Sequence, residues 1–127
     1  MFLTSDLKFS INSSSSIITD SAAGATAFST GKKTYNGAIN MDKNKSPLIP
    51  ITSTLKKHNY KTGIITTSSV THATPACFYG NQIKRYGVDE ELALQFTETD
   101  IDLLMGGGEI FFKHRKDGQD LTEILKR

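Results

Sequence analysis

Ser21 is the side chain in this sequence best placed to do chemistry. It follows Asp20 directly, and a tract of small residues, Ala22–Ala27, begins immediately after it. Asp and Ser are both preferred at the start of a helix, where free N–H groups and the positive end of the helix dipole attract anions. The pattern therefore predicts a hydroxyl at a helix N-terminus, beside a site for an anion such as phosphate. Helix capping alone explains the same two residues, and the local pattern leaves both interpretations open.

Two common motifs do not account for this stretch. A P-loop needs four residues between its first glycine and its Gly-Lys pair, whereas six residues separate Gly24 from Gly31. A hydrolase nucleophile elbow needs a glycine two positions on either side of the serine, and Thr19 and Ala23 occupy those positions. The serine segment is therefore neither of these motifs.

A second group of polar side chains, among them His72 and Thr74, follows a predicted strand at Thr62–Thr67. The carboxyl ends of parallel strands are where α/β proteins bind ligands. By itself, a lone histidine before a helix is more often a cap or a surface residue, and hard cations prefer carboxylates to a single hydroxyl. Pro75 suits the first turn of a helix, which is expected to run about as far as Arg85.

The stretch Ile17–Gly37 resembles the nucleophile segment of the alkaline phosphatases. Its T-D-S-A-A-x-A-T core lies at residues 19–26, and its S-T-G-x-K-T-Y-N-G continuation lies at residues 29–37. This is a long match, far beyond a three-letter motif. The resemblance implies that Ser21 takes up the phosphoryl group and that Asp20 is a catalytic residue beside it.

The sequence T-H-A-T-P-A at residues 71–76 resembles a metal-binding segment of the same family. The resemblance implies that the Thr74 hydroxyl coordinates magnesium and that His72 stands beside the magnesium shell, where family members carry Asp or His. Arg85 lies thirteen residues after His72, the separation at which the family keeps its phosphate-binding arginine. A planar guanidinium suits that role because it can hold two phosphate oxygens at once.

The resemblance also implies two zinc ions that clamp the attacking and leaving oxygens, with a magnesium ion nearby. No zinc ligand is found in this chain, and His58 and His114 lie in no matching segment, so both are expected at the surface. The expected function is phosphate monoester hydrolysis through a phosphoserine at Ser21 with metal assistance, incomplete as given. The alternative is a catalytically inactive phosphate-binding or interaction fragment. The S-T-G-x-K-T-Y-N-G continuation disfavours a sulfatase-like or phosphomutase-like relative.

The elements that must position these residues follow an alternating strand and helix pattern. Runs of β-branched and apolar residues predict buried strands at Ile17–Thr19, Thr62–Thr67 and Ile101–Met105. Helices between strands favour a parallel sheet. We therefore expect an α/β fold, a fragment of a mainly parallel sheet flanked by helices, which the resemblance makes alkaline-phosphatase-like. Besides those after Asp20 and Pro75, the predicted helices are Ile51–Lys57, Val88–Glu98, Glu109–Arg115 and Leu121–Arg127.

Three local details complete the prediction. The helix at residues 51–57 is expected to bury one face, formed by Leu48, Ile51, Thr54 and Leu55. The serine tract Ser13–Ser16 is expected to be a flexible connection. The glycine triplet Gly106–Gly108 is expected to bend the chain where a strand ends.

Composition bounds the class of protein. The chain has 127 residues, 37% of them hydrophobic and 22% charged, with a net charge of +2. This suits one modest domain, and we expect a single partial alkaline phosphatase domain over 1–127, with the resemblance strongest over 13–120. The weak charge predicts no nucleic-acid-binding patch. Cys77 is the sole cysteine, which excludes an internal disulfide.

Compartment and assembly are expectations from the family. No apolar run approaches the ~20 residues needed to cross a bilayer, and Met1–Ser10 lacks the pattern of a secretory signal. The resemblance implies a periplasmic or extracellular location, a phosphate monoester as substrate, and a possible homodimer of the full-length parent.

Overall fold

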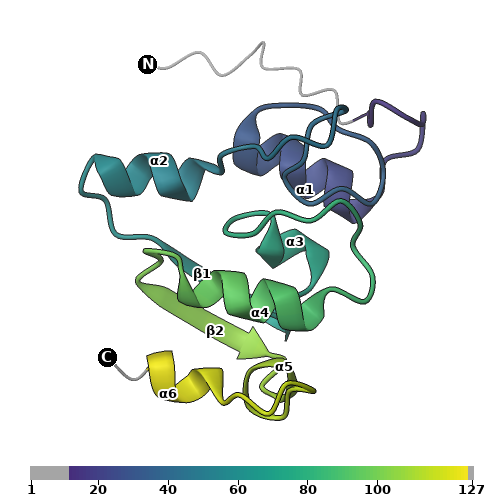
Figure 1. Cartoon of the computed structure of the whole chain (residues 1–127). Coiled ribbons are helices and arrows are strands. Elements are labelled where there is room, and N and C mark those ends of the chain that lie inside the picture. Colours follow the sequence, from purple (N-terminus) through teal and green to yellow (C-terminus); the bar gives the residue numbers. More distant parts are fainter. Residues whose placement is uncertain (1–11, 126–127) are drawn as a thin grey trace.

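Two parallel strands form the sheet of this chain, which we describe from a computed structural model over residues 12–125. The strands are β1 (Gly63–Ser69) and β2 (Leu103–Gly107), and they pair with Ile64 opposite Leu104. The helices are α1 (Ser21–Thr30), α2 (Ile51–Lys57), α3 (Ala73–Ala76), α4 (Asp89–Thr97), α5 (Ile110–Lys113) and α6 (Leu121–Leu125). The connection from β1 to β2 contains α3 and α4, as Figure 1 shows. This arrangement confirms the predicted α/β class.

The core lies on one side of the sheet. Ile64 of β1 belongs to the same buried cluster as Leu92 and Phe96 of α4. The Phe96 ring meets the rings of Tyr79 and Phe112 edge to face, with ring centroids 5.3 and 6.4 Å apart, a geometry that aromatic pairs prefer. These contacts join the sheet, α4 and α5 into one cluster.

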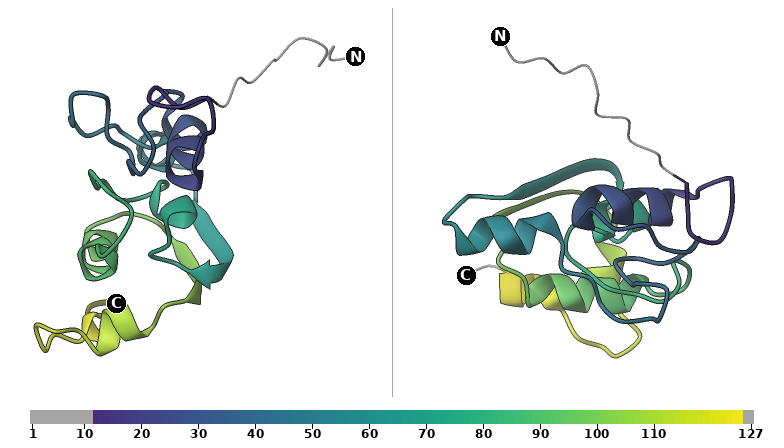
Figure 2. Two further views of the ribbon diagram at one scale, coloured as in Figure 1. Left: turned by 90° about the vertical axis from the view of Figure 1, so that its right-hand side faces the viewer. Right: turned by 90° about the horizontal axis from the view of Figure 1, so that it is seen from above.

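Helix α1 begins and ends as its sequence predicts. The Asp20 carboxylate accepts a hydrogen bond of 2.9 Å from the Ala23 amide at the N-terminus. At the other end, Gly31 adopts a left-handed conformation with φ of 70° and closes the last turn. Small side chains on the helix are buried where it packs on α3 (Figure 2). The helix is therefore fixed at the end that carries Ser21.

Several other predicted elements are confirmed. Helix α2 has the predicted bounds, and α4 and α5 lie within their predicted ranges. Asp120 caps α6 by accepting a bond of 2.9 Å from the Thr122 amide; the predicted end of that helix, residues 126–127, lies outside the described residues. Gly108, with φ of 100°, bends the chain just after β2, and a Cβ there would overlap the Ser69 hydroxyl.

The predicted strand at Ile17–Thr19 is wrong. These residues are irregular, and the side chains of Ile17 and Ile18 are 90% and 81% exposed. A strand needs a neighbour to pair with, and β1 and β2 are the only strands of the sheet in residues 12–125. The Asn36 side chain instead bonds the backbone of Ile18 and Asp20.

Burial of the sheet and of α2 was also predicted wrongly. Ile65 and Met105 are exposed, because the described helices cover only one face of the sheet (Figure 2, left). No residue of α2 is buried, and Ile51 is exposed, whereas Leu48 just before the helix is buried. The local spacing of apolar residues does not reveal which faces find a partner.

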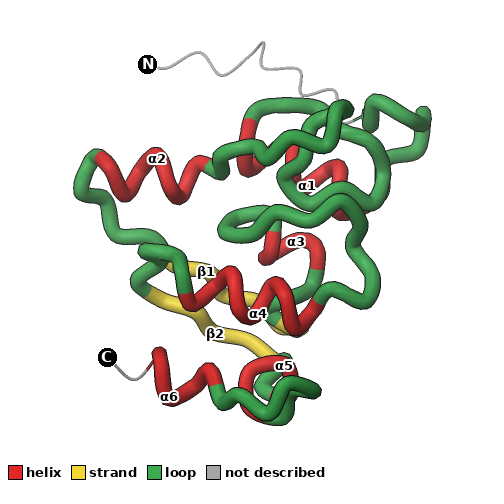
Figure 3. Tube along the Cα trace, in the orientation of Figure 1, coloured by secondary structure: helices red, strands yellow, loops and turns green. Residues whose placement is uncertain are grey.

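The helix predicted from Pro75 to Arg85 is much shorter. Helix α3 ends at Ala76, and Arg85 lies in the long irregular segment that leads to α4 (Figure 3). Gly80 lies so close to the Leu92 side chain that a Cβ would clash with it. In the part of the chain that the structure describes, no helix is long and apolar enough to cross a bilayer.

Candidate active site

Ser21 is the first residue of α1 and is exposed at the helix N-terminus. Its hydroxyl oxygen lies 2.6 Å from Nη1 of Arg85, which donates a hydrogen bond to it. The two residues are 64 positions apart in the sequence, so the contact is a product of the tertiary fold. It brings a potential nucleophile and a permanent cation to the same point.

The Asp20 carboxylate joins three parts of the chain. Its Oδ1 accepts from the Ala23 amide at 2.9 Å. Its Oδ2 accepts from the Gly37 amide at 2.9 Å and from Arg85 Nη1 at 3.3 Å. Because both carboxylate oxygens already accept N–H bonds, Asp20 is better suited to holding Arg85 than to removing a proton from Ser21.

The Arg85 guanidinium is shielded and oriented. Its side chain is only 12% exposed, it forms an ion pair with Asp20, and its central carbon lies 5.1 Å from the centre of the Tyr86 ring. Within residues 12–125 its hydrogen bonds all come from Nη1. A guanidinium has five donors, so further donors remain for the oxygens of an anion.

A groove of about 520 Å³ runs beside the nucleophile, and Thr74 borders it together with Asp20 and Ser21. Its other lining residues are mainly apolar: Asn12, Ile17, Thr19, Gly24, Ala25 and Phe28. His72 is exposed at the start of α3 and does not line this groove. The structure thus gathers Ser21, Asp20 and Arg85, places Thr74 at the same groove, and leaves His72 outside it.

The donor set decides which metal could be held here. Zinc sites use three or four nitrogen, sulfur or carboxylate ligands, and the described residues contain no group of three or more His, Cys, Asp or Glu side chains. These residues therefore do not fit zinc. For magnesium they offer hydroxyl oxygens at Thr74 and Ser21, which is part of an oxygen donor set but not a whole one.

Cys77 is the other potential nucleophile near α1, and the structure disfavours it. It is buried beneath the helix, with its sulfur 3.4 Å from the Thr26 hydroxyl. Burial raises the pKa of the Cys77 thiol to about 11. Since the thiolate is the reactive form, this side chain is unreactive at neutral pH, and Ser21 has no competitor there.

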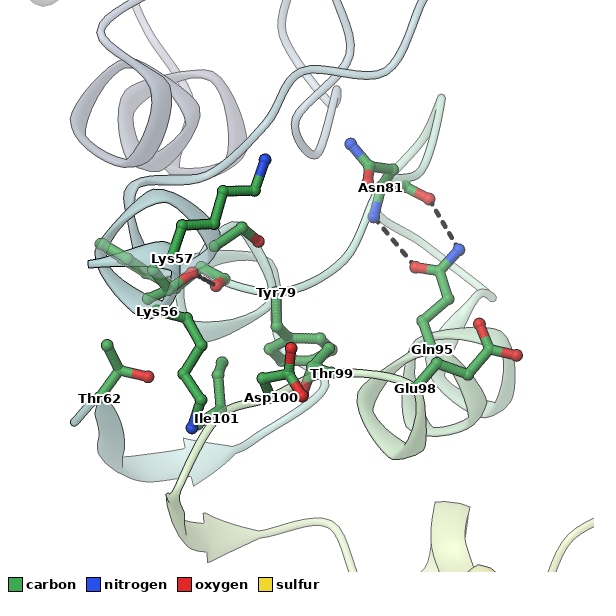
Figure 4. A pocket seen from close by; sticks show the side chains of 13 residues that line it. Lys56, Lys57, Thr62, Tyr79, Asn81, Gln95, Glu98, Thr99, Asp100 and Ile101 are labelled. Carbon is green, nitrogen blue, oxygen red and sulfur yellow. Dashed lines mark hydrogen bonds between the residues drawn. The ribbon is translucent and has the colours of Figure 1, made fainter. Parts of the chain in front are cut away.

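Another cavity, of about 560 Å³, lies between α2, the segment after α3, and the end of α4 (Figure 4). One wall is fixed by Asn81 and Gln95, which exchange two hydrogen bonds of 3.0 and 3.2 Å. Lys56 reaches Asp102 at 3.0 Å and is already paired. Because these polar groups are already paired with one another or with Asp102, we do not take this cavity as the candidate site.

Reasoning from sequence missed the residues that surround Asp20. Asn36 and Gly37 both bond the nucleophile turn, and the Tyr35 hydroxyl donates to the Ile83 carbonyl at 3.0 Å. All three stand in the S-T-G-x-K-T-Y-N-G continuation. Their presence in that long match was the only signal that could have identified them.

Comparisons with known proteins show what the chain is similar to. A family model described as alkaline phosphatase matches residues 2–127. An alkaline phosphatase of Schizosaccharomyces pombe is 43% identical over 122 residues, which is 90% of this chain and 23% of that protein. The structure of alkaline phosphatase from the Antarctic bacterium TAB5 matches with a TM-score of 0.88 and 47% identity, covering 91% of this chain and 34% of that one. A variant of that enzyme, with a histidine replaced by glutamate and magnesium bound in the M3 site, matches with a TM-score of 0.87 and 46% identity, covering 91% of this chain and 33% of that one. The match to the fission yeast relative thus covers only 23% of that protein's length.

Proposed function

We propose, on the premise that the chain belongs to the alkaline phosphatase family, that its Ser21 is the nucleophile of phosphate monoester hydrolysis. In this reaction the Ser21 oxygen forms a bond to phosphorus while the ester P–O bond breaks. Water then hydrolyses the phosphoserine and frees the hydroxyl again. Because the chain spans 23% of the fission yeast relative, we propose this activity for the whole protein of which the segment is a part.

The observation that supports the proposal is the 2.6 Å contact between the Ser21 hydroxyl and Arg85 Nη1 at the N-terminus of α1. A phosphate at this point would meet the helix amides and the free donors of Arg85. Asp20 holds the guanidinium in place from the other side. The arrangement binds the phosphoryl group against the attacking oxygen, which is the positioning that such transfer needs.

Removal of the Ser21 proton needs a further group, because a serine hydroxyl is a weak nucleophile without a base or a metal ion. We propose that metal ions serve this purpose, as in the family, and that Thr74 and His72 contribute to a magnesium site. A bound cation would lower the pKa of the hydroxyl. The zinc ligands would come from outside this segment. The alternative is a phosphate-binding fragment without activity, which the contacts of Arg85 equally support.

The remaining expectations from the family are also proposals. We propose that the chain is one partial alkaline phosphatase domain without an internal boundary. The full-length protein would then act in the periplasm or outside the cell and form a homodimer.

Replacing Arg85 should weaken the binding of inorganic phosphate by the chain. In Arg85→Ala the affinity is expected to fall by about 10- to 100-fold, since a hydrogen bond to a charged group contributes ~1.5–3 kcal/mol. Arg85→Lys keeps the positive charge but lacks the planar guanidinium. Its phosphate affinity should lie between those of Arg85→Ala and the unaltered chain. Isothermal titration calorimetry measures the affinity, with Lys84→Ala, an exposed neighbour, as the control. Equal binding by Arg85→Ala and the unaltered chain would contradict this role.

Replacing His72 by Asp should raise the affinity for magnesium. A carboxylate beside the magnesium shell adds a negative charge and an oxygen, which suit magnesium better than a neutral imidazole. A change beside the metal shell typically alters affinity by ~10–100-fold. The presence of magnesium in a relative whose histidine is replaced by glutamate supports this expectation.

The measurement requires a complete site. We would use a chimera in which residues 12–125 replace the matching segment of the Antarctic enzyme, stripped of metal and titrated with magnesium. His58→Asp, at an exposed histidine after α2, is the matched control. An unchanged magnesium affinity in His72→Asp would contradict the prediction.

A further inference from the structure

The segment Tyr35–Gly37 is bonded to both halves of the candidate site. Asn36 makes two hydrogen bonds to the backbone that leads to the nucleophile. Its Oδ1 accepts from the Asp20 amide at 3.2 Å, and its Nδ2 donates to the Ile18 carbonyl at 2.9 Å. These are the backbone groups that a neighbouring strand would otherwise pair. One side chain thus replaces the sheet partner that the nucleophile segment lacks within residues 12–125.

Gly37 supplies the next contact. Its amide donates to Asp20 Oδ2 at 2.9 Å, and the same oxygen accepts from Arg85. The φ of Gly37 is 87°, a conformation that glycine adopts without steric cost. The carboxylate that holds the guanidinium is therefore itself held by the backbone of this segment.

The same segment also holds the arginine. The Tyr35 hydroxyl donates to the carbonyl of Ile83, two residues before Arg85, at 3.0 Å. Just beyond the segment, Ile39 and Gln82 exchange backbone bonds of 2.9 and 2.8 Å. The arginine segment and the nucleophile segment are thus bonded to one short stretch of chain.

The chain that leads to each half of the site is otherwise irregular within residues 12–125. Residues 12–20 form no strand, and Arg85 lies in the irregular segment between α3 and α4 (Figure 3). The serine tract before the nucleophile is bonded to the same region, through Ser14 to the Thr34 carbonyl at 2.7 Å and from the Asn36 amide to Ser15 at 3.0 Å. The segment Tyr35–Gly37 is therefore bonded both to the nucleophile turn and to the chain that leads to Arg85.

We propose that Tyr35 and Asn36 are positioning residues for the Ser21–Arg85 pair. Asn36 fixes the nucleophile turn, and Tyr35 fixes the approach of the arginine segment. This proposal rests on the proposed function, because it assigns the two residues to the same phosphate site. Neither residue contacts the reacting atoms, so both act through the geometry of the pair, where a displacement of about 1 Å costs ~10²-fold in rate.

The test uses the full chain and two kinds of measurement on Asn36→Ala and Tyr35→Phe. The first is NMR without phosphate, which follows amide hydrogen exchange at Asp20 and Gly37 and the side-chain mobility of Arg85. The second is the affinity for inorganic phosphate by calorimetry. Matched controls are Asn44→Ala and Tyr60→Phe, at exposed positions outside the site.

We expect Asn36→Ala to speed amide exchange at Asp20 and Gly37 and to weaken phosphate binding by ~10-fold. Tyr35→Phe should increase the mobility of the Arg85 side chain while leaving exchange at Asp20 slow. The thermal midpoint should stay close to that of the controls in Tyr35→Phe, since only one half-exposed hydroxyl is removed. This separates positioning from general destabilisation.

The outcomes distinguish the two proposals. If the chain binds no phosphate, the proposed phosphate site is overturned. Amide exchange at Asp20 and Gly37 and the mobility of the Arg85 side chain still decide the positioning roles of Asn36 and Tyr35. Unchanged Arg85 mobility in Tyr35→Phe, together with unchanged exchange in Asn36→Ala, would overturn the positioning roles. If Asn36→Ala does not fold, Asn36→Asp replaces it: this variant keeps an acceptor for the Asp20 amide, loses the donor to Ile18 and adds a negative charge.

Discussion

The 127-residue chain by itself is expected to release no phosphate from a phosphate monoester above background, even with zinc and magnesium supplied. Within residues 12–125 the Ser21 hydroxyl is bonded to Arg85, which is a donor and not a base, and the neighbouring Asp20 carboxylate already accepts three N–H bonds. The described residues hold no group of three metal-binding side chains. Loss of a single stabilising group costs ~10²–10³-fold in other active sites, so the lack of a whole metal site should leave no measurable turnover.

A metal-supplemented phosphatase assay on the purified chain tests this, run beside its Ser21→Ala variant. We expect the purified chain to bind phosphate, because the helix N-terminus and Arg85 are present, but not to turn over a phosphate ester. Zinc-dependent turnover that disappears in Ser21→Ala would contradict the prediction and reveal a metal site within this chain.

In the chimera with the Antarctic enzyme, Ser21→Ala should lower phosphatase activity by at least ~10³-fold, because removal of a covalent nucleophile leaves only binding and electrostatic effects. The chimera itself should be active if residues 12–125 carry the nucleophile and the phosphate arginine. A serine on the surface of α2, Ser53, provides the matched control, and Ser53→Ala should retain full activity. An active Ser21→Ala chimera would place the nucleophile elsewhere.

The start of the site was predictable because it is local. A carboxylate cap followed by small residues specifies a helix N-terminus within a few positions, and α1 begins where Asp20 and Ser21 predict. The parallel pairing of β1 and β2 followed from the helix between them. The Ser21–Arg85 contact joins residues 64 positions apart, which no local pattern links. It was expected from the family resemblance and from the position of both polar stretches after predicted strands.

The supports of the site could not be predicted, and the reason is physical. Whether the β-branched run at Ile17 becomes a strand depends on a neighbour to pair with, and the side chain of Asn36 takes that place here. The length of α3 likewise depends on tertiary packing, including the close approach of Gly80 to Leu92. Such contacts are made by residues far apart in the sequence, which periodicity does not report.

The central claim is that Ser21 carries the phosphoryl group, and its most direct test is to trap the intermediate. The chimera would be mixed with a phosphate monoester, quenched in acid and digested, and the peptide that contains Ser21 would be analysed by mass spectrometry. The account predicts phosphate on Ser21 in the active chimera and none in Ser21→Ala. Turnover without phosphate on Ser21, or with phosphate on another residue, would contradict it.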